Sequence, residues 1–592
     1  MPRWGDSERI VQVCERQRTQ LWDEFERVRP GLVEIARYLY PGALAGLVRD
    51  VKDFKSYSPE EDDDDSARLT GVPFDAFRIA YSGFFVNLTN PNHQWFRLGS
   101  PKFGKVDPSQ DDYYQGVYDK LTDATDWLMK WANVYRPLRT LYKHLVAFGF
   151  GCIATDEDDE RYVFARCLRV GTYALGVDRK GRVDRVVEHF AYTADQMIEE
   201  FGAENVSETI IRAARQGDRS TRFEVWRLIE PHVRIPRCPS PYTLSYERFR
   251  YRSIHWTTDA KDREHGLLSV RGYRIKPIVA PRLEFENGDV YGRGCGKNVV
   301  GRCRGLQTMR ESALEISDQM AHPAMMAPAS MADDGLRLGA YDVNYYPDGL
   351  PPNAVYRAIS TPPGGERLDM DRATLEQEIR KDLFNSEFET INAMQDGAAR
   401  TGRSGDHMTA TEVQVRVNEK MEQLSGIATT LNDELLDPLV TMMSGYVRLS
   451  CEEGGRLPPI LDLPPEIRRG RAPYDIKYES AIHAAASAQA INATATAMKY
   501  AYDIGQMCGS PEVMDNFDAD EATRDIARKL ATPEKYMRNV ESRDALRVQR
   551  AEEAARQQRL QEQAIQARAA KDFMSSPVSP DTIGGALAGT GE

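Results

Sequence analysis

Apolar side chains recur at helical spacing over three long stretches of the N-terminal part of the chain. The first stretch runs over residues 6–40, with a stop expected near Pro30–Gly31 before the pattern resumes, the second over 73–88 and the third over 111–148. Apolar groups three and four positions apart lie on one face of a helix, so each stretch predicts a helix with one buried face. In the third stretch, the large side chains Trp127 and Trp131 are expected on that buried face.

The pattern changes to that of strands between residues 150 and 290. Turn signals separate strand-like segments at 162–165, 171–177, 183–191, 223–229, 249–256 and 267–285. Asp178–Gly181 predicts a hairpin turn, and Thr193 with Gln196 predicts a capping box that starts a short helix. We therefore expect a mixed module here, and a helix-rich α+β fold for the chain.

Long helices are predicted in the C-terminal half, with glycine- and proline-rich segments between them. One helix carries a narrow apolar seam with members three and four residues apart: Leu306, Met309, Ala313, Ile316 and Met320. A stretch rich in Pro and Gly follows over 323–365, and the next helix is expected from about residue 371. Thr409 then starts a capping box for a further helix, which Pro438 should end or kink.

The last part of the chain is predicted to be helical but poor in large apolar side chains. An Ala-rich helix is expected over about 480–505, and Thr532–Pro533 should start a long helix of Ala, Gln, Arg and Glu. Such a helix buries little surface by itself and suits an assembly of several copies.

Composition and charge narrow the possible function classes. The 592 residues, of which 41% are hydrophobic and 28% charged, are enough for several globular domains. A net charge of -13 leaves no broad basic surface of the kind that tight DNA binders use. The eight scattered cysteines lack metal-ligand spacing and indicate reduced thiols. We expect no membrane span, because no apolar run approaches the required length of about 18 residues.

The candidate chemical motifs are all incomplete. The glycine-rich segment at 291–298 has Tyr291 and Asn298 where a phosphate-binding loop needs Gly and Ser or Thr, so we expect a tight strand-to-helix turn. Asp259–Lys261 and Asp475–Lys477 resemble half of a nuclease motif but lack the upstream partner. The acidic run at 60–65 is expected to be a solvated loop. We predict no enzyme activity, no catalytic or metal-binding residues and no cofactor.

Four segments, in a fixed order along the chain, resemble those of one protein family. They are Thr89–Leu98 (with Pro91, Trp95 and Phe96), Tyr291–Arg293 before a helix, Arg400–Arg403 leading into Thr409–Val413, and Glu434–Val440. The family is that of the head-to-tail connector, or portal, proteins of short-tailed bacteriophages. The chain departs from the family pattern in Gly294–Gly296 and in the longer acidic loop at 60–65.

The resemblance implies a portal fold that assembles into a ring, usually of twelve subunits, with a central channel. The ring would sit at one capsid vertex, and each subunit would have a wing, a stem, a clip and a crown. The implied division is 1–293 wing, 294–322 first stem helix, 323–369 clip, 370–395 second stem helix, 396–408 tunnel-facing loop, 409–479 wing return with a long helix, 480–571 crown helices and 572–592 disordered tail.

The resemblance also implies a function and its partners. The ring would be a structural conduit for double-stranded DNA during packaging and ejection, without sequence specificity. It would dock the terminase packaging ATPase and tail adaptor proteins, and contact capsid and scaffolding proteins. Such a protein would be part of the virion, after assembly in the host cytoplasm. Arg400, Arg403 and His407 would face the DNA. The apolar seam of the first stem helix, which is too narrow to support a self-contained domain, is independently predicted to lie between subunits.

Two other function classes remain open from the sequence. A nuclease or NTPase of DNA processing would need a convergent polar site, which the motifs do not supply. Another ring-forming tail or capsid component would share the assembly but lack the paired stem helices.

Overall fold

The computed structural model divides the chain into two compact units, residues 1–489 and 490–592, and each is described by itself. The described residues are 4–53, 70–99, 108–158, 160–232, 249–258, 266–321, 325–326, 357–358, 365–389, 424, 426–451, 461, 463–468, 474–478, 494–504, 506–507, 516–518, 520, 522–523 and 540–575.

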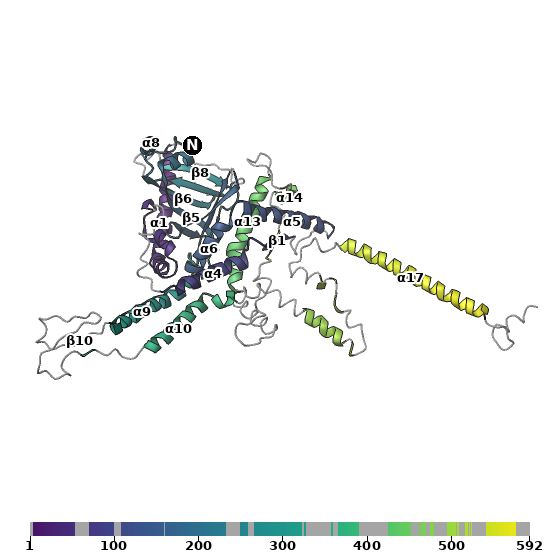
Figure 1. The fold of residues 1–592 in the computed structure, drawn as a ribbon. Coiled ribbons are helices and arrows are strands. Elements are labelled where there is room, and N and C mark those ends of the chain that lie inside the picture. The colour runs from purple at the N-terminus through teal and green to yellow at the C-terminus, as the bar shows by residue number, and fades with distance from the viewer. Residues whose placement is uncertain are drawn as a thin grey trace, which may run out of the picture. The chain divides into compact units, whose positions relative to one another are not determined.

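Helices make up the N-terminal part of the first unit (Figure 1). Their bounds are α1 (Trp4–Tyr38), η1 (Pro41–Ala43), α2 (Leu44–Val48), η2 (Val51–Asp53), α4 (Val72–Leu88), α5 (Pro108–Trp131) and α6 (Tyr135–Phe148). The helix predicted over 73–88 is confirmed, and so is helix within 6–40, but the stop expected near Pro30–Gly31 is wrong: α1 continues through Pro30 to Tyr38. Phe25, Leu32 and Ile35 on either side of the proline are buried in the core, which holds the helix together despite the one backbone hydrogen bond that Pro30 cannot donate. The stretch 111–148 is two helices, and Asn133 between them has a left-handed backbone (φ 53°), which Asn tolerates better than most residues.

The prediction that Trp127 and Trp131 are buried is wrong. Their exposed fractions are 44% and 52%, and their rings stack on each other with centroids 5.7 Å apart. The buried face of α5 is formed instead by Leu121, Thr125 and Leu128, each 0% exposed. Two tryptophans four positions apart therefore form a stacked pair on a different face of the helix.

The strands form two main antiparallel sheets (Figure 1). A five-stranded sheet has the order β4 (Tyr173–Val177), β5 (Val183–Thr193), β6 (Arg222–Pro231), β7 (Tyr251–Trp256) and β8 (Leu267–Tyr273); a three-stranded sheet has the order β3 (Tyr162–Cys167), β2 (Ile153–Asp158) and β9 (Ile278–Val279). Two short pairs are β1 (Phe96–Gly99) with β12 (Asp475–Tyr478), and β10 (Met325–Met326) with β11 (Arg357–Ala358).

Two details of the sheet region test the sequence patterns. The capping box is confirmed: the Thr193 backbone N–H donates to Gln196 Oε1 over 3.1 Å, and α7 (Ala194–Phe201) starts there.

The single strand expected over 267–285 is wrong, because it is divided between β8 and β9 in different sheets. Pro277 lies between them and has no N–H to continue a ladder, and its carbonyl accepts from the backbone of Thr155 over 2.8 Å.

Both faces of the five-stranded sheet are covered. On one face, Phe223 and Val225 of β6 join a small core with α7 and α8 (Glu208–Arg215). On the other face, Trp226 and Leu228 join the main core with α1. The alternation along β6 therefore places the sheet between two helical layers.

The C-terminal part of the first unit is again helical. Its helices are α9 (Cys295–Ala321), α10 (Gly365–Asp382), η8 (Asn432–Leu436), α13 (Asp437–Ser450) and α14 (Pro465–Arg468). The end or kink expected at Pro438 is found as an interruption of the regular helix: a π-helical turn at η8 precedes the proline, and α13 begins at Asp437 with Pro438 in its first turn. In this turn the Asp437 N–H bonds to the Asn432 carbonyl. The wider π-helical turn leaves room for the pyrrolidine ring of Pro438, which would clash with the preceding turn of a regular α-helix.

The second unit contains α17 (Val540–Ser575), whose side chains are almost all exposed where they are described. Residues 494–504 are helical, as expected for part of the Ala-rich segment. The acidic run at 60–65, the capping box at Thr409 and the start of the last helix at Thr532 lie outside the described residues.

Candidate functional site

The α9–α10 pair is two long helices that run antiparallel from the body of the first unit (Figure 1). Arg302 on α9 fixes their register: its Nε lies 2.9 Å from Glu378 Oε2, and its Nη1 forms a second ion pair with Asp382. Leu375 of α10 and Ile379, which is 0% exposed, pack on the inner side of α10. One arginine therefore bridges two carboxylates one helical turn apart and holds the helices together.

Three glycines, Gly292, Gly294 and Gly296, bring the start of α9 into direct contact with the backbone at the end of α6. We call this contact the glycine seat. A Cβ on Gly292 would lie 2.4 Å from the Gly149 oxygen, and one on Gly294 would lie 2.4 Å from the Gly149 nitrogen. A Cβ on Gly296 would lie 2.2 Å from the Ala147 oxygen. These are backbone atoms, which cannot rotate away, so only glycine permits the approach. The glycines lead directly into α9, as expected, and serve packing; the strand expected before them is reduced to an isolated bridge between Arg293 and Glu284.

A buried arginine ties this seat to the C-terminal helices. Arg282, 1% exposed, places Nη2 2.9 Å from Glu434 Oε1 on η8. Its remaining N–H groups donate to the carbonyls of Asp289 over 2.9 Å and Gly181 over 2.7 Å. The guanidinium also lies 3.8 Å from the centre of the Phe285 ring. All these partners compensate for the loss of hydration of a buried charge.

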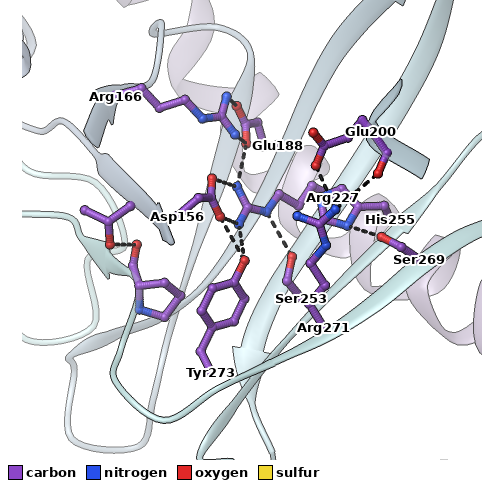
Figure 2. Close-up of polar contacts among 12 residues, drawn as sticks. Asp156, Arg166, Glu188, Glu200, Arg227, Ser253, His255, Ser269, Arg271 and Tyr273 are labelled. Carbon is purple, nitrogen blue, oxygen red and sulfur yellow. Dashed lines mark hydrogen bonds and ion pairs between the residues drawn. The ribbon is translucent and has the colours of Figure 1, made fainter. Parts of the chain in front are cut away.

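A second buried network joins the two main sheets (Figure 2). Arg227 on β6, 2% exposed, donates to Asp156 on β2 over 3.1 Å, and its other nitrogens reach Ser253 Oγ over 2.9 Å and Tyr273 Oη over 3.0 Å. Burial alone would raise the pKa of Asp156, but the Arg227 guanidinium holds it well below its usual range. Next to it, Arg166 Nη2 donates to Glu188 over 2.7 Å. The network therefore stabilises the body on which α9 is seated.

No catalytic arrangement is present among the residues that the structure describes. Within them, no group of three or more His, Cys, Asp and Glu could hold a metal ion. Asp475 and Lys477, from one of the partial nuclease motifs, pair with Gly99 and Arg97 in the β1–β12 ladder; Asp259–Lys261 lies outside the described range. Over the same described part of the chain, no helix is both long and apolar enough to cross a membrane.

The residues of the predicted apolar seam on α9 differ in how deeply they are buried. Leu306 is 1% exposed and belongs to the core of its own subunit, whereas Met309, Ala313 and Ile316 are half-buried along α9. The Met320 side chain lies outside the described part of the structure.

The predicted tunnel-facing residues Arg400, Arg403 and His407 also lie outside the described residues.

Sequence reasoning missed Arg227, Asp156 and Arg282. Their only signal is a charged residue inside an otherwise apolar strand or turn, and this signal does not identify the partner. Arg227 and Asp156 lie 71 positions apart, so only the folded chain brings them together.

Comparison with known proteins identifies relatives over most of the chain. A family model described as bacteriophage head to tail connecting protein matches residues 11–537. The chain is 26% identical over 492 residues to the portal protein of Salmonella phage epsilon15, which covers 81% of this chain and 82% of the relative. It is 26% identical over 446 residues to a probable portal protein of Bordetella phage BPP-1, covering 75% of each. A portal protein of Enterobacteria phage T3 is 22% identical over 318 residues, covering 53% of this chain and 52% of the relative.

Proposed function

The chain belongs to the family of bacteriophage head-to-tail connecting proteins, and from this premise we propose that its α9–α10 pair is the stem of a portal ring. As a member of this family, the protein is a structural portal and not an enzyme: it forms the connector at the capsid vertex through which double-stranded DNA is packaged and ejected.

The α9–α10 pair supports the stem assignment. Its 27-residue α9 is about 40 Å long at 1.5 Å per residue, enough to line a channel. Arg302 fixes the two helices to each other, and the glycine seat fixes them to the body. A channel wall past which DNA slides needs helices that are held rigidly in place. The net charge of -13 also limits electrostatic binding of the duplex to that wall.

We propose a dodecamer in which the half-buried seam of α9 faces the next copy. Met309, Ala313 and Ile316 then lose their remaining exposure in the ring. Electron microscopy of the purified full chain, viewed end-on, tests this arrangement. Rings of twelve with a central hole are expected; compact particles without a hole would overturn the ring proposal.

The segment between the two stem helices is proposed as the clip. The division drawn from the sequence gives it residues 323–369, of which the last five already belong to α10, since that helix begins at Gly365. Between the two helices, the short strands β10 and β11 pair with each other. Inserts of this kind carry binding surfaces more often than core packing. We propose that it docks the terminase packaging ATPase and later the tail adaptors. A ring lacking residues 332–360 should assemble but not retain the ATPase in a pull-down; normal retention would contradict the assignment.

We also propose contacts beyond the clip. Capsid and scaffolding proteins would surround the ring in a virion that assembles in the host cytoplasm. The loop 396–408 would bring Arg400, Arg403 and His407 to the DNA, where cations contact phosphates without reading bases. Capsids with Arg400→Ala and Arg403→Ala should package DNA but retain it less well at low salt. Equal retention at low and high salt would show that the loop is only a linker.

A further inference from the structure

Two tryptophans of α5 and two side chains of β3 form an exposed cluster of rings, which we call the aromatic patch. Trp127 and Trp131, 44% and 52% exposed, stack on each other, and the Trp127 ring centre lies 6.4 Å from that of Tyr162. Phe164, two positions after Tyr162 on the same face of the strand, is 56% exposed. An aromatic side chain can bury about 150–250 Å² of surface, so these half-exposed rings together approach the size of patches that mark interaction sites.

Carboxylates lie beside the aromatic patch. Asp123 is exposed and lies one turn before Trp127 on the same face of α5. The turn between β2 and β3 adds Asp158 and the exposed Glu160, together with the cation Arg161. The patch therefore combines aromatic rings with acidic groups at its edge.

A pocket of about 480 Å³ is lined by α1, by residues 48–51 and by strands β5 and β6. Its rings pack closely: His189 stacks on Trp226 with centroids 3.9 Å apart, and Trp22 meets both rings edge-on. The ring nitrogens His189 Nε2 and Trp226 Nε1 are buried and have no hydrogen-bond partner among the described residues. The subunit by itself therefore leaves polar groups of this lining unsatisfied.

Arginines give the pocket its charge. Arg18, Arg29 and Arg49 line it, against the two carboxylates of Asp23 and Asp50, and we call it the arginine pocket. The Arg18 guanidinium already lies 4.7 Å from the centre of the Trp226 ring. Guanidinium groups are attracted to the faces of aromatic rings and form strong hydrogen bonds with carboxylates. The pocket therefore suits an aromatic side chain that has carboxylates beside it.

The aromatic patch and the arginine pocket belong to opposite sides of the first unit. Figure 1 shows α1 at one side of the unit and α5 at the other, with β5, β6 and α13 between them in this view. The contacts within a ring are heterologous: one face of each copy binds a different face of the next. Two complementary surfaces on opposite sides of one subunit meet this requirement.

We propose that the aromatic patch of each copy binds in the arginine pocket of the next copy around the ring. This inference rests on the proposed function, because it requires a ring. The contact joins the bodies of neighbouring subunits and is separate from the seam on α9. Trp and Arg are the residues most enriched among those that dominate binding energy at protein interfaces.

Site-directed cross-linking in rings of the full chain tests the contact. Val48, 60% exposed, lines the arginine pocket, and Glu160 lies beside the aromatic patch. Rings of a chain with both Val48→Cys and Glu160→Cys, treated with a short bismaleimide, should give a ladder of covalent multimers. Mixed rings of the two single variants should give dimers and nothing larger, because each copy then carries one reactive position. Wild-type rings, which keep the native cysteines, measure the background.

Trp127→Ser with Trp131→Ser should weaken the ring and leave the subunit folded, because both side chains are exposed. Ultracentrifugation should show these rings dissociating at a protein concentration roughly thirty-fold higher than wild-type rings, the factor expected for loss of one dominant interface residue. Val86→Ser is the matched control: it changes an exposed apolar side chain of α4, 39% exposed, and should leave dissociation unchanged.

The outcomes separate this inference from the proposed function. Intact rings of the double-cysteine chain without cross-links above the wild-type background would overturn the contact and leave the portal assignment in place. Unchanged dissociation of the double tryptophan variant, or an equal shift in the Val86→Ser control, would overturn it as well. A wild-type chain that forms no ring would instead contradict the proposed function.

Discussion

Arg282 and Glu434 form a buried ion pair, with Arg282 Nη2 2.9 Å from Glu434 Oε1, although 152 positions separate them in the sequence. Arg282 precedes the seat of α9, and Glu434 lies in the π-helical turn before α13. The pair therefore joins the two ends of the segment that contains the stem and the clip. We therefore expect the position of the stem helices on the body to depend on the Arg282–Glu434 ion pair.

Replacing Arg282 should strongly destabilise the subunit. Arg282→Met leaves Glu434, whose side chain is 17% exposed, without its cation, and leaves the Asp289 and Gly181 carbonyls without a donor. Removing one partner of a buried pair costs about 3–5 kcal/mol. The free energy of unfolding in urea measures the change. Arg212→Met is the control, because its pair with Glu208 is exposed and contributes about 1 kcal/mol or less; equal losses in both variants would contradict the prediction.

The glycine seat gives a second prediction. Gly294→Ala places a Cβ 2.4 Å from the Gly149 nitrogen and 2.9 Å from the Leu145 carbonyl oxygen, so α9 must shift. We expect a stability loss of several kcal/mol and fewer rings. Gly301→Ala, on the same helix with nothing within 4 Å of the new Cβ, should raise subunit stability by about 0.5–1 kcal/mol. Thermal unfolding and ultracentrifugation measure both. A Gly294→Ala protein with wild-type stability and rings would show that the close approach is not needed.

Local patterns predicted much of the secondary structure. The helix over 73–88 and the capping box at Thr193 follow from spacing and end signals within a few residues. The two partners of a long-range pair carry no such signal. The β1–β12 ladder joins Phe96 to Tyr478, and its pairing depends on the packing of the whole unit.

The sequence predicted the site less completely than the fold. It indicated the glycine turn and the first stem helix, because both are local. It grouped Leu306 with Met309 and Ile316 because all three share one spacing, but burial differs along that seam. Near the body the seam meets the subunit core, and farther along it leaves the core. Periodicity identifies a face of a helix and does not say what covers it.

A third prediction concerns pH. Burial, together with the nearby Lys143 and Arg169, lowers the pKa of His144 to about 3, so the folded protein keeps this imidazole neutral. The unfolded chain takes up a proton near pH 6.5. His144 therefore contributes full stability above about pH 6.5, and this contribution is lost as the pH falls through that value towards about 3.

The loss should approach about 1.4 kcal/mol per pH unit below the unfolded pKa. In His144→Gln this slope should disappear, so the stability difference between wild type and variant should shrink between about pH 6.5 and 5. Urea unfolding at several pH values measures it, and the carboxylates titrate mainly below this window. Parallel pH curves for the two proteins would contradict the prediction.

The final prediction tests the seam between subunits. Leu306 belongs to the core, so Leu306→Asp would unfold the subunit and report nothing about the ring. Met309→Asp with Ile316→Asp instead changes half-buried positions and should leave the subunit folded. In the ring, both carboxylates would be buried without cations, at a cost of several kcal/mol per interface. Leu314→Asp is the control: it is 44% exposed and, two positions before Ile316, faces about 200° away. Ultracentrifugation should show rings for the control and free subunits for the double variant; rings of normal size from the double variant would show that the seam does not face a neighbour.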